Sequence, residues 1–217
     1  MRRAVIVIIV IVGLLVIADR LAVVAAQSTV AARIETDQSL SQRPDVSIRG
    51  FPFLTQAIGG RYAHVTLTLH DLRDRTVPVQ TLTVDLHGVH VPLGSVFSQH
   101  VTRVPVDRAA ATVLISFADL NSYFSEQQRH FFFSAGDNGQ IKVTLVTAPA
   151  GHTVSVSGNG RIDVRGSDLV VTVGHGLDLT IPLGGLPFRI ALVGAKATKA
   201  GIVVQATASG LVLHPGS

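Results

Sequence analysis

The amino-terminal end of the chain is almost purely apolar. After two arginines, the run Ala4–Ala18 holds only apolar residues and one glycine, and apolar residues resume at Leu21–Ala26. At about 1.5 Å of rise per helical residue, the first run reaches roughly 22 Å, so only the longer stretch crosses a hydrocarbon core of ~30 Å. The pattern predicts a transmembrane signal anchor within residues 1–26. The two arginines place the amino terminus in the cytoplasm and residues 27–217 outside the membrane, as an extracytoplasmic domain.

A cleaved signal peptide is the alternative. Small residues precede position 27, and they fit a peptidase cut after Ala26. Asp19 and Arg20 lie between the apolar run and that site, and these charges favour an uncut anchor. A snorkelling Arg20 would let the longer run cross the bilayer. In both interpretations the domain is exported. It is secreted if the amino terminus is removed, and it stays attached to the membrane if the anchor is uncut.

An apolar stripe at three- and four-residue steps follows the anchor. The stripe predicts an amphipathic helix over residues 20–41, which continues the anchor helix into the domain and ends before Pro44. Its members are Val23, Ala26, Val30 and Ile34. Because basic residues are sparse on the polar face, we expect the stripe to pack on a sheet rather than on a membrane surface.

Period-two alternation of apolar and polar residues dominates the rest of the chain. It is clearest at 65–70 and 82–87, where apolar residues alternate with Thr, Asp and His. After Gly88 the apolar positions change parity to Val89 and Val91, which predicts a β-bulge at the glycine. Similar short segments lie at 177–181, 188–192 and 202–204. Turns rather than helices join these segments, so the pattern predicts an antiparallel sheet with one apolar face.

Two Asn-Gly pairs indicate turns. One is Asn138-Gly139, and the other lies within Gly158–Gly160. At the second position we expect a hairpin with a three-residue loop, because that loop pairs Val156 with Ile162. A two-residue turn would place Val156 opposite Asp163 and put a valine and a carboxylate on the same face.

One internal helix interrupts the predicted strands. Ser116 and Asp119 have the spacing of a capping box, and apolar residues follow on one side of a helix running to about Gln128. Shorter helical turns are predicted at 53–58 and 93–97. The segment Gly50–Phe53 is echoed by Gly185–Phe188, each with an apolar residue before proline and a phenylalanine after it.

Composition narrows the functional classes. The net charge is +4, but lysines and arginines are scattered in runs of at most two. Nucleic-acid binding requires a clustered basic surface, so this class is disfavoured. The absence of cysteine excludes disulfides, thiolate nucleophiles and Cys-ligated metals. With 47% hydrophobic and 15% charged residues, the composition excludes a disordered, collagen-like or coiled-coil chain. Together with this, the predicted helices and alternating strands lead us to expect an α+β, mostly β domain.

A search for catalytic motifs finds none. The chain lacks a Gly-x-Ser-x-Gly elbow, a His-Glu-x-x-His pair and a phosphate-binding loop. His87 and His90 are three residues apart, which on a regular strand directs them to opposite faces, although a bulge at Gly88 leaves a metal site there as an open alternative. His64 and His70 share a face but lie roughly 20 Å apart along the strand. The acidic pairs are flanked by arginines, as is usual for solvated turns; they are Asp71 with Asp74 and Asp163 with Asp168. We therefore expect no catalytic residue, metal or cofactor.

Residues 44–56 (PDVSIRGFPFLTQ), followed by GRY at 60–62 and a valine-rich strand, carry the most specific pattern in the chain. This signature resembles that of the LmeA-like family, which comprises actinobacterial membrane-associated phospholipid-binding proteins named for lipomannan elongation. Looser matches lie at 89–93, 119–120 and 186–188. The resemblance implies a tubular lipid-binding fold, in which a curved antiparallel sheet is wrapped on a long helix. It also implies binding of phospholipid, with a lipid of phosphatidylinositol type as the expected ligand, in support of cell-envelope lipoglycan assembly, and it supplies no catalytic residues.

We therefore expect an apolar cavity that holds acyl chains beside the cytoplasmic membrane. The predicted mouth residues are Phe51, Phe53, Leu54, Ile58, Leu186 and Phe188, and the predicted walls are Leu120, Tyr123, Phe124 and Phe132. The basic residues adjoining the mouth, predicted to meet a lipid phosphate, are Arg49, Arg61 and Arg189. Two alternatives remain: a scaffolding envelope domain with a filled core, and an envelope glycolipid enzyme whose polar cluster is assembled from distant strands.

Overall fold

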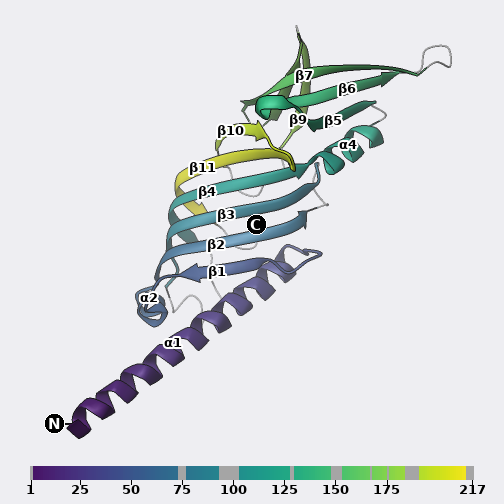
Figure 1. The fold of residues 1–217 in the computed structure, drawn as a ribbon. Coiled ribbons are helices and arrows are strands. Elements are labelled where there is room, and N and C mark those ends of the chain that lie inside the picture. The colour runs from purple at the N-terminus through teal and green to yellow at the C-terminus, as the bar shows by residue number, and fades with distance from the viewer. Residues whose placement is uncertain are drawn as a thin grey trace. The chain divides into compact units, whose positions relative to one another are not determined.

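The computed structural model describes residues 2–72, 77–92, 103–127, 130–147, 153–166, 168–174, 176–183 and 191–213. Its helices are α1 (Arg2–Asp37), α2 (Phe53–Gly59), α4 (Phe117–Glu126) and the 3₁₀ turn η1 (Asp137–Gly139). Its strands are β1 (Asp45–Arg49), β2 (Arg61–Leu72), β3 (Val79–His90), β4 (Val104–Ser116), β5 (Phe131–Ala135), β6 (Ile141–Thr147), β7 (Val154–Arg165), β8 (Asp168–Val173), β9 (Leu177–Pro182), β10 (Ala191–Ala197) and β11 (Gly201–Leu213) (Figure 1).

The strands form two antiparallel sheets that are curved but not closed. One has six strands in the order β1-β2-β3-β4-β11-β10, and the other has five in the order β5-β6-β7-β8-β9. The predicted fold class, α+β and mostly β with a long amino-terminal helix, is confirmed. The alternating segments are thus divided between two sheets, because β5–β9 pair only with one another among the described strands.

The chain separates into two compact units, which we describe one at a time. Unit 1 comprises Met1–Thr68, Asp85–Ala109 and Ser209–Ser217. Unit 2 comprises Leu69–Val84 and Ala110–Ala208.

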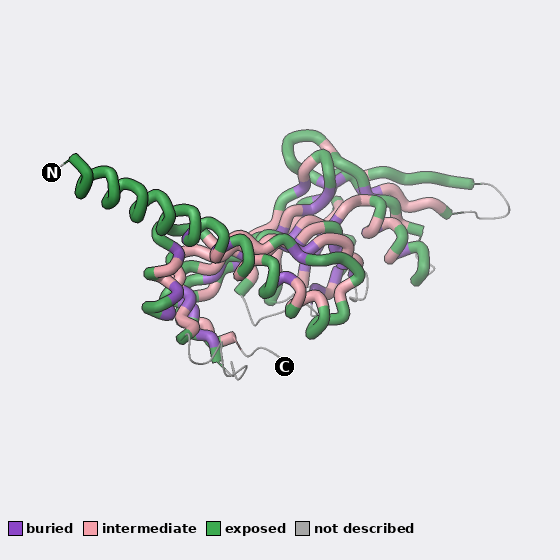
Figure 2. Tube along the Cα trace, turned by 90° about the horizontal axis from the view of Figure 1, so that it is seen from below, coloured by how far each residue is buried: buried purple, intermediate pink, exposed green. Residues whose placement is uncertain are grey.

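Helix α1 belongs to unit 1 and joins the predicted anchor and the predicted amphipathic helix into one 36-residue element. Its large apolar side chains from Val5 to Ile17 are exposed (Figure 2), and within the described residues α1 is the one helix long and apolar enough to cross a membrane. Its buried residues are Asp19, Val23 and Ala31, on the face that contacts β1 and α2. Val30 of the predicted stripe is 40% exposed, so the buried face turns to Ala31 instead.

Helix α2 sits between β1 and β2, whose antiparallel register runs from Asp45↔Thr68 to Arg49↔His64. The predicted helical turn at 53–58 is therefore present. It ends at Gly60, where φ is +61° and a Cβ atom would lie 2.9 Å from the Cα atom of Pro92. Only glycine satisfies both requirements at little cost.

Strand β3 contains the predicted irregularity. Gly88 has φ of +64°, and the buried positions change from Leu82 and Val84 to Val89. A Cβ atom at Gly88 would lie 2.0 Å from Oδ2 of Asp107, so the glycine also makes room for that carboxylate.

The predicted hairpin at Gly158–Gly160 is wrong. Strand β7 runs without a turn through these residues, pairing with β6 (Ile141↔Gly160) and with β8 (Gly160↔Val173). Glycine is needed here because neighbouring side chains leave no room for a larger residue, not because the chain turns. A Cβ atom at Gly160 would lie 3.0 Å from Cγ1 of Val171 and 3.1 Å from Cγ2 of Ile141. The predicted turn at Asn138-Gly139 is present between β5 and β6, with positive φ at both residues.

Helix α4 begins at the predicted cap. The Asp119 amide donates to Ser116 Oγ at 3.0 Å, and the helix ends at Glu126, two residues before the predicted position. Leu120 and Phe124 are buried, and the Phe124 ring lies 4.8 Å from that of Phe133 on β5. The most deeply buried side chains of unit 2 also include Ile115, Ile141, Leu169, Ile181 and Ile202. The predicted helical turn at 93–97 and the echo at 185–188 lie outside the described residues.

Candidate functional site

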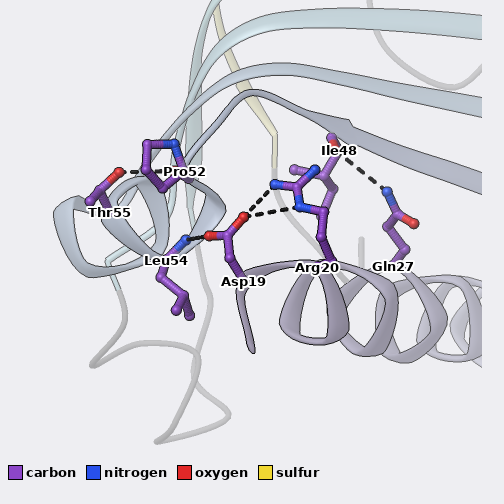
Figure 3. A network of polar contacts seen from close by, with 7 residues as sticks. All are labelled: Asp19, Arg20, Gln27, Ile48, Pro52, Leu54 and Thr55. Carbon is purple, nitrogen blue, oxygen red and sulfur yellow. Dashed lines mark hydrogen bonds and ion pairs between the residues drawn. The ribbon is translucent and has the colours of Figure 1, made fainter. Parts of the chain in front are cut away.

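The junction of α1 with α2 in unit 1 is organised around a buried carboxylate. Asp19 is 2% exposed, although it directly follows the apolar run Ala4–Ala18 of α1. Its Oδ1 accepts from the Leu54 amide at 2.8 Å, and its Oδ2 accepts from Arg20 Nε at 3.2 Å and from Arg20 Nη2 (Figure 3). The first amides of a helix have no acceptor within the helix, and the Asp19 carboxylate supplies one for the Leu54 amide of α2. This hydrogen bond holds α2 against α1.

Apolar packing reinforces this junction. Val23, Phe53 and Ala57 form a buried cluster, and partly buried side chains pack against it. These are Ala22, Ala26, Ile48, Leu54 and Tyr62. The Phe53 and Tyr62 rings lie 6.1 Å apart, so the predicted mouth residue Phe53 is a core residue of unit 1 rather than an exposed one.

Other side chains of the same segment point away from the protein. Phe51 is 65% exposed and Ile58 is 75% exposed. On α1, Leu21 and Val24 are exposed to 67% and 61% just beyond Asp19. The Arg20 guanidinium carbon lies 5.2 Å from the centroid of the Phe51 ring, a cation–π geometry that places a basic group beside these apolar side chains.

A second apolar cluster of unit 1 lies on the sheet. Val89, Val104 and Val106 are buried, and side chains that remain partly open to solvent surround them. We call this ring of residues the apolar surface of unit 1: Tyr62, Val65, Leu86, Val91, Leu211 and Leu213. Tyr62 also belongs to the cluster around Phe53, so the apolar surface is continuous with the α1–α2 junction. Burial raises the pKa of the Tyr62 hydroxyl and keeps it neutral.

A polar cluster lies on the first strands of unit 1. The rings of His64 and His87 stack at 4.3 Å, and Asp85 Oδ1 lies 3.1 Å from His64 Nε2 and accepts from Thr66 Oγ1 at 2.8 Å. Partial burial works to raise the pKa of Asp85, but the hydrogen bonds with Thr66 and His64 outweigh it, so the pKa lies below its usual range.

Two of the three predicted phosphate-binding arginines, Arg49 and Arg61, lie on strands β1 and β2 of unit 1. Arg49 is exposed at the end of β1, opposite His64 in the register. Arg61 is exposed at the start of β2, with Nη2 3.5 Å from Asp107 Oδ2. His90 Nδ1 lies 3.8 Å from Asp107 Oδ1. Arg189, with Leu186 and Phe188, lies outside the described residues.

The histidines of this region lie in two separate clusters of ring and ion-pair contacts. In the described ranges, no group of three or more His, Asp or Glu side chains is placed to hold a metal ion. The pair left open around Gly88 is divided between two clusters, since His87 stacks on His64 while His90 faces Asp107. These contacts fit structural ion pairs on a sheet surface.

The predicted wall residues all belong to unit 2. Leu120 and Phe124 are buried in the packing of α4 on β5, Tyr123 is half-buried with its ring edge-on to Phe124, and Phe132 is 48% exposed. Their contact with lipid stays a prediction.

Sequence reasoning missed the roles of Asp19 and Arg20 at this site. The signal was present, because one carboxylate and one guanidinium interrupt an apolar run. The amide that receives the carboxylate lies 35 residues further along the chain, and neither spacing nor periodicity indicates it.

Comparison with known proteins gives one match. Residues 17–207 match the protein family described as LmeA-like phospholipid-binding, so the match begins just before Asp19 and covers most of the chain. No curated protein and no solved structure matches the chain.

Proposed function

Because the chain belongs to the LmeA-like phospholipid-binding family, we propose that unit 1 holds phospholipid acyl chains on its apolar surface while α1 anchors the chain in the cytoplasmic membrane. The family supports lipid binding in general. The surface, the anchor and the orientation are our proposals.

The observation that carries the proposal is the apolar surface itself. Its six members are apolar or aromatic, and each is partly open to solvent around a buried valine cluster. Apolar side chains left half-covered in a contiguous group indicate a binding surface rather than a finished core. Each methylene of an acyl chain that is buried there contributes about 0.8 kcal/mol to binding. Burial of several consecutive methylenes therefore suffices for stable binding.

The polar end of the lipid has basic residues to meet. Arg49 and Arg61 are exposed beside the α2 segment, and a guanidinium binds phosphate oxygens in a bidentate manner. We propose these two, with Arg189, as head-group contacts, and Phe51, Leu54 and Ile58 as the mouth, with the buried Phe53 supporting them from the core. A phosphatidylinositol-type lipid remains our preferred ligand on the basis of the family resemblance.

The proposal assigns no catalytic step. Residues 27–217 form an extracytoplasmic lipid-binding domain that supports envelope lipid and lipoglycan assembly by presenting a bound lipid. A scaffolding domain without lipid is the alternative, and it predicts that the purified chain retains none.

Native mass spectrometry of the full chain, released from detergent, tests the proposal. We expect phospholipid to remain bound to the wild-type chain after extensive washing. Leu211→Asp places a charge on the apolar surface and should abolish this retention. Its matched control is Val212→Asp on the same strand, because Val212 is 43% exposed and does not belong to the apolar surface.

Two results would contradict the proposal. One is a wild-type chain free of lipid, and the other is equal retention by Leu211→Asp and Val212→Asp. Far-UV circular dichroism of both variants checks that β structure is retained.

A further inference from the structure

The depth of Asp19 in the bilayer can be worked out from the length of α1. Counting from Ala4, residue 19 lies about 22 Å along the helix, whereas a hydrocarbon core is ~30 Å thick. With Ala4 at one boundary, the opposite boundary falls near Val24. Asp19 then lies roughly 8 Å inside the core at that end, if the helix stands upright.

Helix α2 lies at the same depth. The Leu54 amide is 2.8 Å from Asp19 Oδ1, and α1 and α2 pack against each other through the Val23–Phe53–Ala57 cluster. A helix that packs against this part of α1 cannot stay in water while α1 crosses the bilayer. Lying about 5–10 Å into the boundary of head groups and acyl chains is typical of interfacial helices.

The side chains on the outside of this junction suit that environment. Phe51 and Ile58 are exposed to 65% and 75%, and Leu21 and Val24 of α1 are exposed to 67% and 61%. Scattered exposed apolar residues are common, but these four lie on α1, on α2, which contacts α1, and just before α2, close in sequence to the exposed apolar run of the anchor or to its packing partner. At that depth the Asp19 carboxylate accepts from the Leu54 amide and from Arg20 Nε, so this charge does not enter the bilayer unpaired.

We propose that residues 50–60, which we call the docking segment, insert into the bilayer leaflet at the Asp19 end of α1, with Phe51 and Ile58 among the lipid acyl chains. Arg20 reaches from the helix over the Phe51 ring toward the head groups. This inference rests on the proposed anchoring role of α1. It deepens that role, because it places the α2 end of unit 1 in the leaflet from which the lipid is taken.

Site-specific labels test the docking segment. The chain contains no cysteine, so a single introduced one carries the only label. An environment-sensitive fluorophore is attached to the full chain through Ile58→Cys, and the protein is reconstituted in phosphatidylcholine–phosphatidylglycerol vesicles with or without doxyl-labelled lipid. We expect a blue shift of emission and a loss of intensity with doxyl lipid. Gly59→Cys, where no atom lies within 4 Å of an added Cβ, provides a second label position.

Two further labels separate the possible outcomes. Val10→Cys reports whether α1 is in the bilayer, and Val156→Cys labels a 64% exposed valine on β7 of unit 2 as the matched apolar control. Quenching at positions 10, 58 and 59 but not at 156 supports the inference. If the label is quenched at position 10 but is as little quenched at positions 58 and 59 as at 156, the docking segment is not in the bilayer. This result overturns the inference and leaves the anchor intact.

The remaining outcomes also decide. If position 10 is not quenched, both the anchor and the docking segment are overturned. If position 156 is quenched as strongly as 58, the contact is not confined to the docking segment and the inference fails. Lipid retention by the Leu211 and Val212 variants is measured separately, so lipid binding can fail or hold independently of these labels.

Discussion

At the scale of single residues, Asp19 joins helices α1 and α2 through one buried side chain. A buried carboxylate is retained only when its partners satisfy it, and here one partner is an amide at the start of another helix. Asp19→Ala removes this bond and leaves the Leu54 amide without its partner, at a cost of about 1–3 kcal/mol. We expect faster hydrogen exchange at the first amides of α2.

The control for this prediction is Asp37→Ala on the same helix. Asp37 makes an exposed ion pair with Arg33 at 3.5 Å, and such i,i+4 pairs contribute only about 0.3–0.5 kcal/mol. Equal exchange rates in the two variants would contradict the role assigned to Asp19.

The Asp85 carboxylate makes the stability of the fold depend on pH in the acid range. Its hydrogen bonds hold the pKa of the folded state below the unfolded value of about 3.9, so the ionised carboxylate stabilises the fold above that pH. The contribution is lost as the pH falls through the folded pKa. Circular dichroism during acid titration should therefore show a shallower loss of stability below pH ~4 in Asp85→Asn, which is also less stable than wild type at neutral pH. An unchanged acid profile would show that the Thr66 and His64 contacts contribute nothing.

At the scale of elements, β7 shows where pattern reading fails. Glycine next to asparagine is typical of a turn, because both residues readily adopt positive φ. Adjacent residues alone do not reveal which neighbouring strands pair with the segment. The strand continues because β6 and β8 pair with it on both sides through these residues. The positions are glycines because Val171, Val173 and Ile141 on those strands occupy the space where side chains would stand. The helix α4 was predictable by contrast, because Ser116 and Asp119 are neighbours in sequence as well as in space.

The crowding at β7 predicts an asymmetry between glycines. Gly160→Ala should destabilise the fold by about 1–3 kcal/mol through overpacking against Val171 and Ile141. Gly194→Ala on β10 should be neutral or slightly stabilising, because nothing lies within 4 Å of an added Cβ and alanine lowers the entropy of the unfolded chain. Thermal unfolding of the two variants compares them directly, and equal midpoints would refute the crowding argument.

The cap of α4 offers a second test at this scale. Ser116→Ala removes the acceptor of the Asp119 amide and should cost about 1 kcal/mol in the free energy of unfolding. Ser116→Asp restores an acceptor at the same position and should recover most of the loss. Denaturant unfolding curves measure both, and a Ser116→Ala variant as stable as wild type would show that the cap is redundant.

At the scale of the whole molecule, the family and the fold class followed from the sequence, because alternation and the Gly-Phe-Pro-Phe signature are local patterns. The division of strands between two sheets did not follow, since strand pairing across long loops depends on packing that no short segment encodes. The lipid contacts of the candidate site stay a prediction, although the burial of its residues is now defined: Phe51 and Ile58 are exposed, whereas Phe53 is in the core.

The proposed anchoring of the protein in a membrane by α1 can be tested on the full chain. The exposed side chains of Val7, Ile11 and Leu14 lie in the middle of the apolar run, where each aspartate costs roughly 2.5–3.5 kcal/mol on insertion scales. The triple replacement Val7→Asp, Ile11→Asp, Leu14→Asp should move the chain from the membrane pellet to the soluble fraction after carbonate extraction. Val156→Asp should leave it in the pellet. A triple variant that still pellets would remove the case for a membrane-spanning α1.

The uninterrupted course of α1 has a mechanical consequence. No linker separates the apolar part of α1 from the part that packs on β1, and the Asp19–Leu54 hydrogen bond joins α1 to α2 as well. With α1 in a membrane as proposed, unit 1 is therefore held at a fixed distance from the bilayer rather than on a flexible tether. On the same proposal, lipid exchange takes place beside the anchor, and a recipient of the lipid reaches unit 1 by diffusing in the plane of the membrane.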